Sequence, residues 1–101
     1  MWFLITAEAK EGVTLKEIQE KRKEWVERGI ESVLQRTCKS VERFAVLGVS
    51  PRKAFWLIET EDWGISHIFA DHFGDLWRIQ TYHVVRQSLA EALRPKAGEP
   101  A

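Results

Sequence analysis

Two segments of this sequence carry apolar side chains on both faces of an extended strand. Residues 2–9 place Trp2 and Leu4 on one face and Phe3 and Ile5 on the other. Residues 53–60 repeat the pattern, with two alternating sets that are both apolar (Ala54, Trp56 and Ile58; Phe55 and Leu57). A strand that is apolar on both faces needs cover on both. The chain therefore has to bury two faces of one sheet.

A long helix is predicted between these strands, from residue 15 to the residue before Ser40. Thr14 and Glu17 form a capping box at its start, and Gly29 predicts a break within it, because glycine costs about 1 kcal/mol relative to alanine inside a helix. One face follows helical spacing and forms the predicted core stripe (Leu15, Ile18, Arg22, Trp25, Val26, Ile30, Val33 and Leu34).

The remaining pattern completes a β-α-β-β-α-β order. Further strands are predicted over residues 42–49 and 77–85, and a second helix ends near Phe73, with Gly74 as its stop. This order is the ferredoxin-like arrangement, an α+β fold with a four-stranded antiparallel sheet and helices on one face. We predict one domain, residues 1–94, including a short C-terminal helix over 88–94, and a flexible tail, 95–101.

Composition excludes several function classes. The 101 residues include 15 Lys and Arg against 15 Asp and Glu. This balance argues against a dedicated binder of nucleic acid or of anionic membranes, since both require excess basic charge. No run approaches the roughly 20 apolar residues of a membrane helix. Cys38 has no second cysteine to pair with, which suits a reducing compartment, and we expect a cytoplasmic protein.

The second apolar sheet face needs to be covered. In the predicted fold the helices cover only one face, and an exposed apolar sheet invites association. We therefore predict a homodimer that packs sheet against sheet by twofold symmetry. The alternative is that the terminal helix, residues 88–94, folds over that face.

The last strand brings polar groups to the predicted interface. Arg78, Gln80 and Tyr82 alternate onto one face, and we expect them to point between the paired sheets together with three residues of other strands (Trp2, Thr6 and Trp56). Aromatic walls with a few polar groups are typical of small-molecule sites. The alternative is that these groups only form hydrogen bonds across the dimer.

The three histidines are the candidate proton-transfer groups. His67 and His72 are five residues apart on the second helix, a spacing that does not suit shared metal binding, so we predict no metal site. His72 lies on the apolar stripe and is predicted to pack in the core. His83 is the candidate catalytic residue, together with its neighbour Tyr82, and Arg78 would stabilise a developing anion.

Three segments resemble the dimeric α+β-barrel superfamily, and in particular small members related to muconolactone-isomerase-like and antibiotic-biosynthesis-monooxygenase-like proteins. They are the start Met1-Trp2-Phe3-Leu4-Ile5-Thr6, residues 55–62 (FWLIETED) and residues 73–85 (FGDLWRIQTYHVV). The resemblance implies a homodimer more firmly than a reaction, since the superfamily includes isomerases, cofactor-independent oxygenases, haem-degrading enzymes and proteins with no known activity.

Three functions follow from these observations. The first is a dimer that binds a small apolar or aromatic molecule between its sheets, with no cofactor. The second is an isomerase or cofactor-independent oxygenase that acts on a small cyclic substrate. The third is a structural or regulatory dimer without a ligand.

Overall fold

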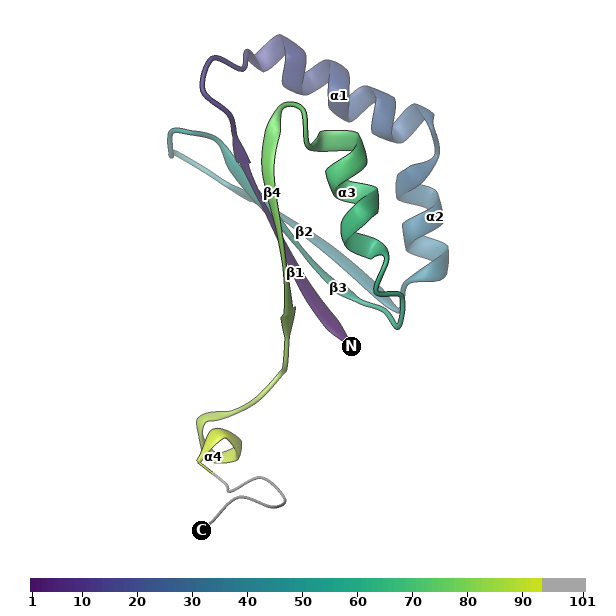
Figure 1. The fold of residues 1–101 in the computed structure, drawn as a ribbon, viewed down its shortest axis with the longest axis vertical. Helices are drawn as coiled ribbons and strands as arrows, with labels where there is room; N and C mark the ends of the chain where they lie inside the picture. The colour runs from purple at the N-terminus through teal and green to yellow at the C-terminus, as the bar shows by residue number, and fades with distance from the viewer. Residues whose placement is uncertain (94–101) are drawn as a thin grey trace.

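A computed structural model describes residues 1–93 of the chain, in which one antiparallel sheet of four strands carries helices on one side (Figure 1). The strands are β1 (Trp2–Ala9), β2 (Ser40–Val46), β3 (Lys53–Glu59) and β4 (Trp77–Val84), in the spatial order β2-β3-β1-β4. The predicted α+β class is confirmed. The predicted tail, residues 95–101, lies outside the described residues.

The helical layer consists of α1 (Leu15–Glu27), α2 (Ile30–Thr37) and α3 (Ile65–Phe73). The predicted break is confirmed: Gly29 lies between α1 and α2 with φ of 71°, a left-handed conformation that glycine adopts without the steric cost of a Cβ. The capping box is confirmed as well, because the Thr14 hydroxyl accepts from the Glu17 backbone at 3.2 Å and Glu17 accepts from the Thr14 backbone at 3.0 Å.

The core lies between these helices and the sheet. It is built from alternate residues of β1 and β3, from the first residue of β4 and from the inner faces of α1, α2 and α3 (Phe3, Ile5, Ala7, Ile18, Trp25, Leu34, Trp56, Ile58, Ile65, Phe69, Phe73 and Trp77). The predicted core stripe of the long helix was partly wrong, since Val26 is 66% and Val33 is 42% exposed. Within α1 only Ile18 and Trp25 are buried, and Val26, which follows Trp25, lies outside this narrow stripe. After Gly29 the chain changes direction, so the stripe does not continue as one face into α2 (Figure 1).

Several element boundaries differ from the prediction by a few residues. β2 ends at Val46 instead of residue 49. α3 begins at Ile65, after a turn in which the Asp62 carboxylate accepts from the Gly64 backbone at 2.8 Å. Gly74 ends α3 as predicted, with the Gly74 amide donating to the Ala70 carbonyl at 2.9 Å.

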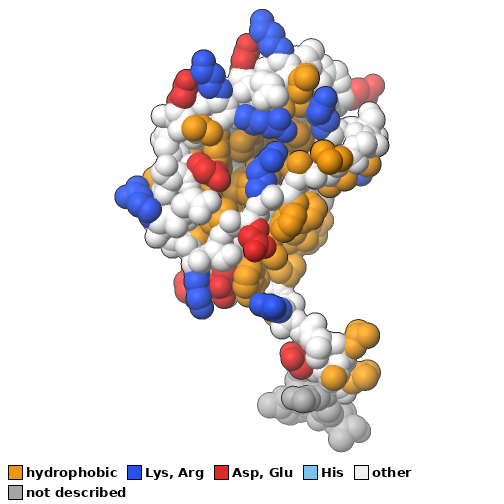
Figure 2. Space-filling model, turned by 180° about the vertical axis from the view of Figure 1, so that it is seen from behind, with side chains coloured by type: hydrophobic (Ala, Val, Ile, Leu, Met, Phe, Trp, Pro, Cys, Tyr) orange, Lys and Arg blue, Asp and Glu red, His pale blue; other side chains and the backbone are white. Residues whose placement is uncertain are grey.

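The C-terminal helix α4 (Leu89–Ala92) lies at the end of an extended segment, away from the sheet and helices (Figure 1). Leu89 and Leu93 are 85% and 84% exposed, and Figure 2 shows hydrophobic side chains on this separate projection. The alternative that residues 88–94 fold over the sheet is therefore wrong for the part that the structure describes, residues 88–93. No helix within residues 1–93 is long and apolar enough to cross a membrane.

Candidate functional site

The sheet face opposite the helices, here called the open face, carries apolar side chains among charged and polar ones. The strand register places the even-numbered residues of β1, β2 and β4 and the odd-numbered residues of β3 on it. Eight of these residues are apolar or aromatic (Trp2, Leu4, Phe44, Val46, Phe55, Leu57, Tyr82 and Val84). The rings of Phe44 and Phe55 stack with centroids 4.9 Å apart across β2 and β3. The helices and α4 leave this face open to solvent.

Most of the residues predicted to face the space between the sheets do lie together on the open face. The register pairs Thr6 with Gln80, and Trp2 lies further along the same face of β1. The Tyr82 hydroxyl donates to the Gln80 side-chain carbonyl at 2.7 Å. We call Thr6, Arg78, Gln80 and Tyr82 the polar cluster. A shallow hollow of about 330 Å³ is lined by three of its members, Thr6, Arg78 and Gln80, and by neighbours such as Phe55 and Lys53.

Trp56 was assigned to the wrong face. It pairs with the fully buried Ile5, and it lies under the helices with its ring centroid 4.8 Å from that of Phe69. Only 6% of Trp56 is exposed. Both alternating sets of β3 are apolar, so composition gave no preference between the two faces, and the packing of three aromatic rings (Trp56, Phe69 and Phe73) decided it.

The two candidate catalytic residues lie on opposite faces of β4, as adjacent residues of a strand must. Tyr82 shares the open face with Arg78, whereas His83 is on the helix side and is exposed. The His83 ring has its centroid 5.4 Å from Phe3 and 4.9 Å from Trp63. Tyr82 and Arg78 therefore share the open face, and His83 lies on the other side of the sheet.

A second pocket opens between α1 and the β2–β3 side of the sheet. It measures about 330 Å³ and is lined by four aromatic side chains, Trp25, Trp56, Phe73 and Trp77, and by three charged ones, Arg22, Arg43 and Glu31, with Val26 and Ala54 completing it. We call it the aromatic–arginine pocket. Its lining residues come from six elements of the fold, α1, α2, β2, β3, α3 and β4. The pocket therefore exists only once the chain has folded.

The two arginines of this pocket are held beside its aromatic walls. The guanidinium carbon of Arg43 lies 5.6 Å from the centroid of the Trp56 ring, a cation–π distance. Burial lowers the pKa of the half-buried Arg22 guanidinium below its ordinary value, and the positive charges of Arg43 and Arg52 lower this pKa further. Arg22 and Arg43 therefore both bring positive charge to the lining of one pocket.

The carboxylate of the pocket has a different partner. Glu31 accepts from the indole nitrogen of Trp25 at 2.6 Å, which orients both side chains. Within residues 1–93, the ion pairs involve lysines and the N-terminal amine, and neither Arg22 nor Arg43 takes part in one. The pocket therefore contains positive charge that its own acidic residue does not neutralise.

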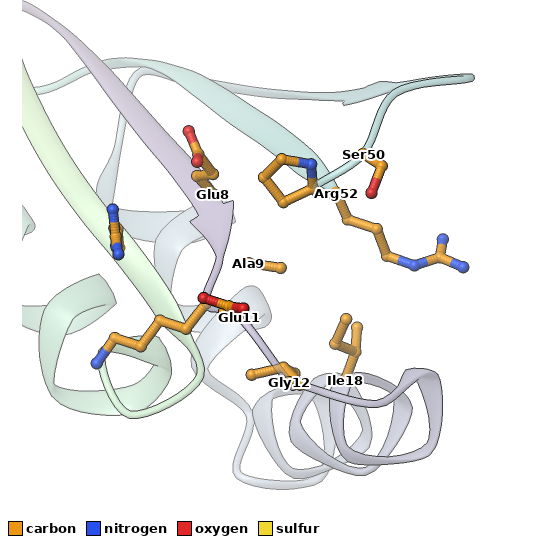
Figure 3. Close-up of a pocket in the computed structure, with 11 residues that line it drawn as sticks. Glu8, Ala9, Glu11, Gly12, Ile18, Ser50 and Arg52 are labelled. Atoms are coloured by element: carbon orange, nitrogen blue, oxygen red, sulfur yellow. The ribbon is translucent and has the colours of Figure 1, made fainter.

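A third pocket, the hairpin pocket, lies where β1 ends beside the β2–β3 turn and the start of α1. Its volume is about 540 Å³ and its lining is mostly charged or small (Glu8, Ala9, Lys10, Glu11, Gly12, Val13, Ile18, Ser50, Pro51, Arg52 and Arg78). Figure 3 shows the Arg52 side chain extending away from Glu8 and Glu11. Lys10 donates to the Gly74 carbonyl at 2.8 Å. Because these charged groups do not converge, the pocket presents no single binding centre.

His72 is a core residue, as predicted. It is 4% exposed, with its Nε2 2.9 Å from the Lys21 carbonyl and its Nδ1 3.1 Å from an Arg28 guanidinium nitrogen. An arginine can only donate, so Nδ1 accepts and the ring is the neutral Nε2–H tautomer. Both ring nitrogens are therefore used in packing α3 against α1. In the described part of the chain, no group of three or more His, Cys, Asp or Glu is arranged to hold a metal ion.

Comparison with known proteins finds a distant likeness to a solved structure. No family model matches the chain, and no curated protein matches it. The chain is similar to the crystal structure of the protein At3g17210 from Arabidopsis thaliana, at 14% identity over 86% of this chain and 97% of that one, with a TM-score of 0.45. A likeness this distant carries no inference about the site, which therefore rests on the geometry described above.

Proposed function

We propose that the chain is a ferredoxin-like domain that forms a homodimer through its open face and binds a small apolar or aromatic molecule. The dimer would be an α+β barrel, with two sheets packed face to face. Its support is the open face itself, where Phe44 and Tyr82 are 43% and 47% exposed among other apolar side chains. A second copy would cover this face. The lone cysteine supports a reducing compartment, and we propose the cytoplasm.

The main support for the binding function is that four aromatic side chains line the aromatic–arginine pocket. Small-molecule sites are concave, mostly apolar and furnished with a few polar groups, and they usually range from about 300 to 1,000 Å³. At about 330 Å³, this pocket is of a size for a molecule of one or two rings. Val26, which is 66% exposed, lies at its rim.

The polar cluster on the open face is the second candidate site. It is favoured by the hollow of about 330 Å³ beside Thr6 and Gln80, which a facing sheet would close. A ligand there would lie between the two subunits. If the protein is instead an isomerase or a cofactor-independent oxygenase, this cluster is where the reaction would occur, with Tyr82 transferring a proton and Arg78 stabilising an anion.

Quenching of tryptophan fluorescence tests the binding function and distinguishes the two sites. The probe is 4-nitrobenzamide, a neutral nitroaromatic that quenches indole emission on contact. We expect saturable quenching by the wild-type protein. Val26→Phe should raise the dissociation constant of the probe at least tenfold, because the larger side chain narrows the pocket rim. Val33→Phe, a matched change on α2 outside this pocket, should leave binding unchanged.

Two results would contradict this proposal. Quenching that rises linearly without saturation would mean that no pocket binds the probe. Saturable binding that Thr6→Leu abolishes and Val26→Phe does not would move the ligand to the space between the sheets. Circular dichroism of each variant confirms that the fold is kept.

A further inference from the structure

The aromatic–arginine pocket has a charge pattern that its proposed function does not require. An apolar ligand needs aromatic walls alone. Yet Arg22 of α1 and Arg43 of β2 reach the same pocket from two different elements. Seen from behind, the molecule has hydrophobic side chains exposed near its middle, with Lys and Arg side chains lying over and beside them (Figure 2).

These two arginines make few interactions with the rest of the described chain. Arg43 lies over the Trp56 ring at a cation–π distance, and Arg22 is half-buried and lines the same pocket. Neither forms an ion pair within residues 1–93, although five such pairs occur there, and Glu31 is already engaged by Trp25. Two neighbouring guanidinium groups without an acidic partner are stabilised when an anion binds between them.

We propose that the aromatic–arginine pocket binds small aromatic carboxylates, with the ring held among Trp25, Trp56 and Trp77 and the carboxylate held by Arg22 and Arg43. This proposal rests on the proposed function and specifies its ligand class. The planar fork of an arginine matches the two oxygens of a carboxylate.

The pocket also limits the charge of that ligand. The Glu31 carboxylate lines the same pocket and opposes a second negative charge. The two arginines and Glu31 sum to one positive charge, with Arg52 close enough to lower the pKa of Arg22. A monoanion balances this set, whereas a dianion such as a phosphate monoester exceeds it. The aromatic carboxylate is therefore the ligand class that this site matches in both shape and charge.

Matched probes test the charge requirement separately from aromatic binding. The acid 4-nitrobenzoate and the neutral 4-nitrobenzamide have nearly the same size and the same quenching group. We expect the wild-type protein to bind 4-nitrobenzoate at least tenfold more tightly than 4-nitrobenzamide. Arg43→Gln and Arg22→Gln should each weaken 4-nitrobenzoate binding about tenfold and change 4-nitrobenzamide binding less than twofold. Arg36→Gln, a matched change at an exposed position of α2 outside this pocket, should affect neither probe.

The outcomes separate the two proposals. If both probes bind saturably and equally, the pocket binds aromatic molecules and the arginines do not select an anion, so the present inference is wrong and the proposed function stands. If neither probe saturates, the proposed function is wrong and the inference falls with it. An equal loss of both probes in Arg43→Gln would mean that Arg43 only supports the Trp56 wall, which also overturns the carboxylate assignment.

Discussion

Leu57→Lys is expected to dissociate the proposed homodimer. Leu57 lies on the open face of β3, between Leu4 of β1 and Glu42 of β2, and it is half-buried within its own chain. A second copy packed on this face would bury the rest of the side chain. The substitution places an ammonium group in that interface and, by symmetry, does so in both subunits.

The expected cost follows from the exposure of Leu57. Burying a leucine side chain fully is worth about 1.5–3 kcal/mol, so the half that remains exposed contributes about 1 kcal/mol in each subunit. The two subunits together lose about 2 kcal/mol, which raises the dissociation constant roughly 30-fold. Burial of the lysine charge adds to this cost, so 30-fold is a lower bound.

Sedimentation equilibrium over a range of protein concentrations measures this dissociation constant directly. The wild type should sediment at twice the monomer mass, and Leu57→Lys should shift toward the monomer. Val33→Lys is the control, because Val33 is 42% exposed on α2, in the layer on the other side of the sheet. A monomeric wild type would refute the reasoning, as would equal weakening by both variants, because the interface would then not lie on the open face.

Three further substitutions test how the helices are built. Gly74→Ala should lower stability by about 1–3 kcal/mol in thermal unfolding, because a Cβ there would overlap the Ala70 carbonyl oxygen, and an unchanged Tm would contradict this steric argument. Gly29→Ala should cost about 1–2 kcal/mol through its positive φ alone, since a Cβ there meets no atom within 4 Å, and Gly29→Asn should cost less; equal Tm values for the two variants would oppose this reading. Hydrogen bonds from the Thr14 backbone and hydroxyl hold the pKa of Glu17 below its ordinary value. The ionised cap therefore stabilises the fold above the ordinary carboxyl pKa, and this stability is lost as the pH falls through the lowered pKa, so the Tm difference between wild type and Glu17→Ala should be largest near neutral pH and shrink in acid.

Local signals in the sequence predicted the parts of the fold that depend on neighbouring residues. The Thr14–Glu17 capping box and the break at Gly29 are set by the chemistry of a few adjacent positions, and both are present. The alternation of β4 likewise placed Tyr82 and His83 on opposite faces. The burial of His72 followed from its position on the apolar stripe of α3. Each of these features needs no knowledge of which element packs against which.

The face of Trp56 could not be predicted in this way. A shift of strand register by one residue exchanges the two faces, and the usual guide is that only one of them is apolar. Both sets in β3 are apolar, so the direction of Trp56 depended on contacts with Phe69 and Phe73, which follow it by 13 and 17 positions in the chain. A strand that needs cover on both sides therefore indicates a partner and, for the same reason, conceals which residues face it.

The sequence indicates the aromatic–arginine pocket only weakly, through the positions of its two arginines. Arg22 interrupts an otherwise apolar helical stripe, and Arg43 alternates onto the helix side of β2. Either position alone is ordinary for arginine, whose apolar stem can lie along the edge of a core with the charged end in water. What singles them out is that both reach one aromatic pocket from separate elements, where their charges repel and no acidic side chain pairs with them within residues 1–93. A bound monoanion would give both arginines a partner, and this is why the charge of the ligand, more than its size, is the property to test first.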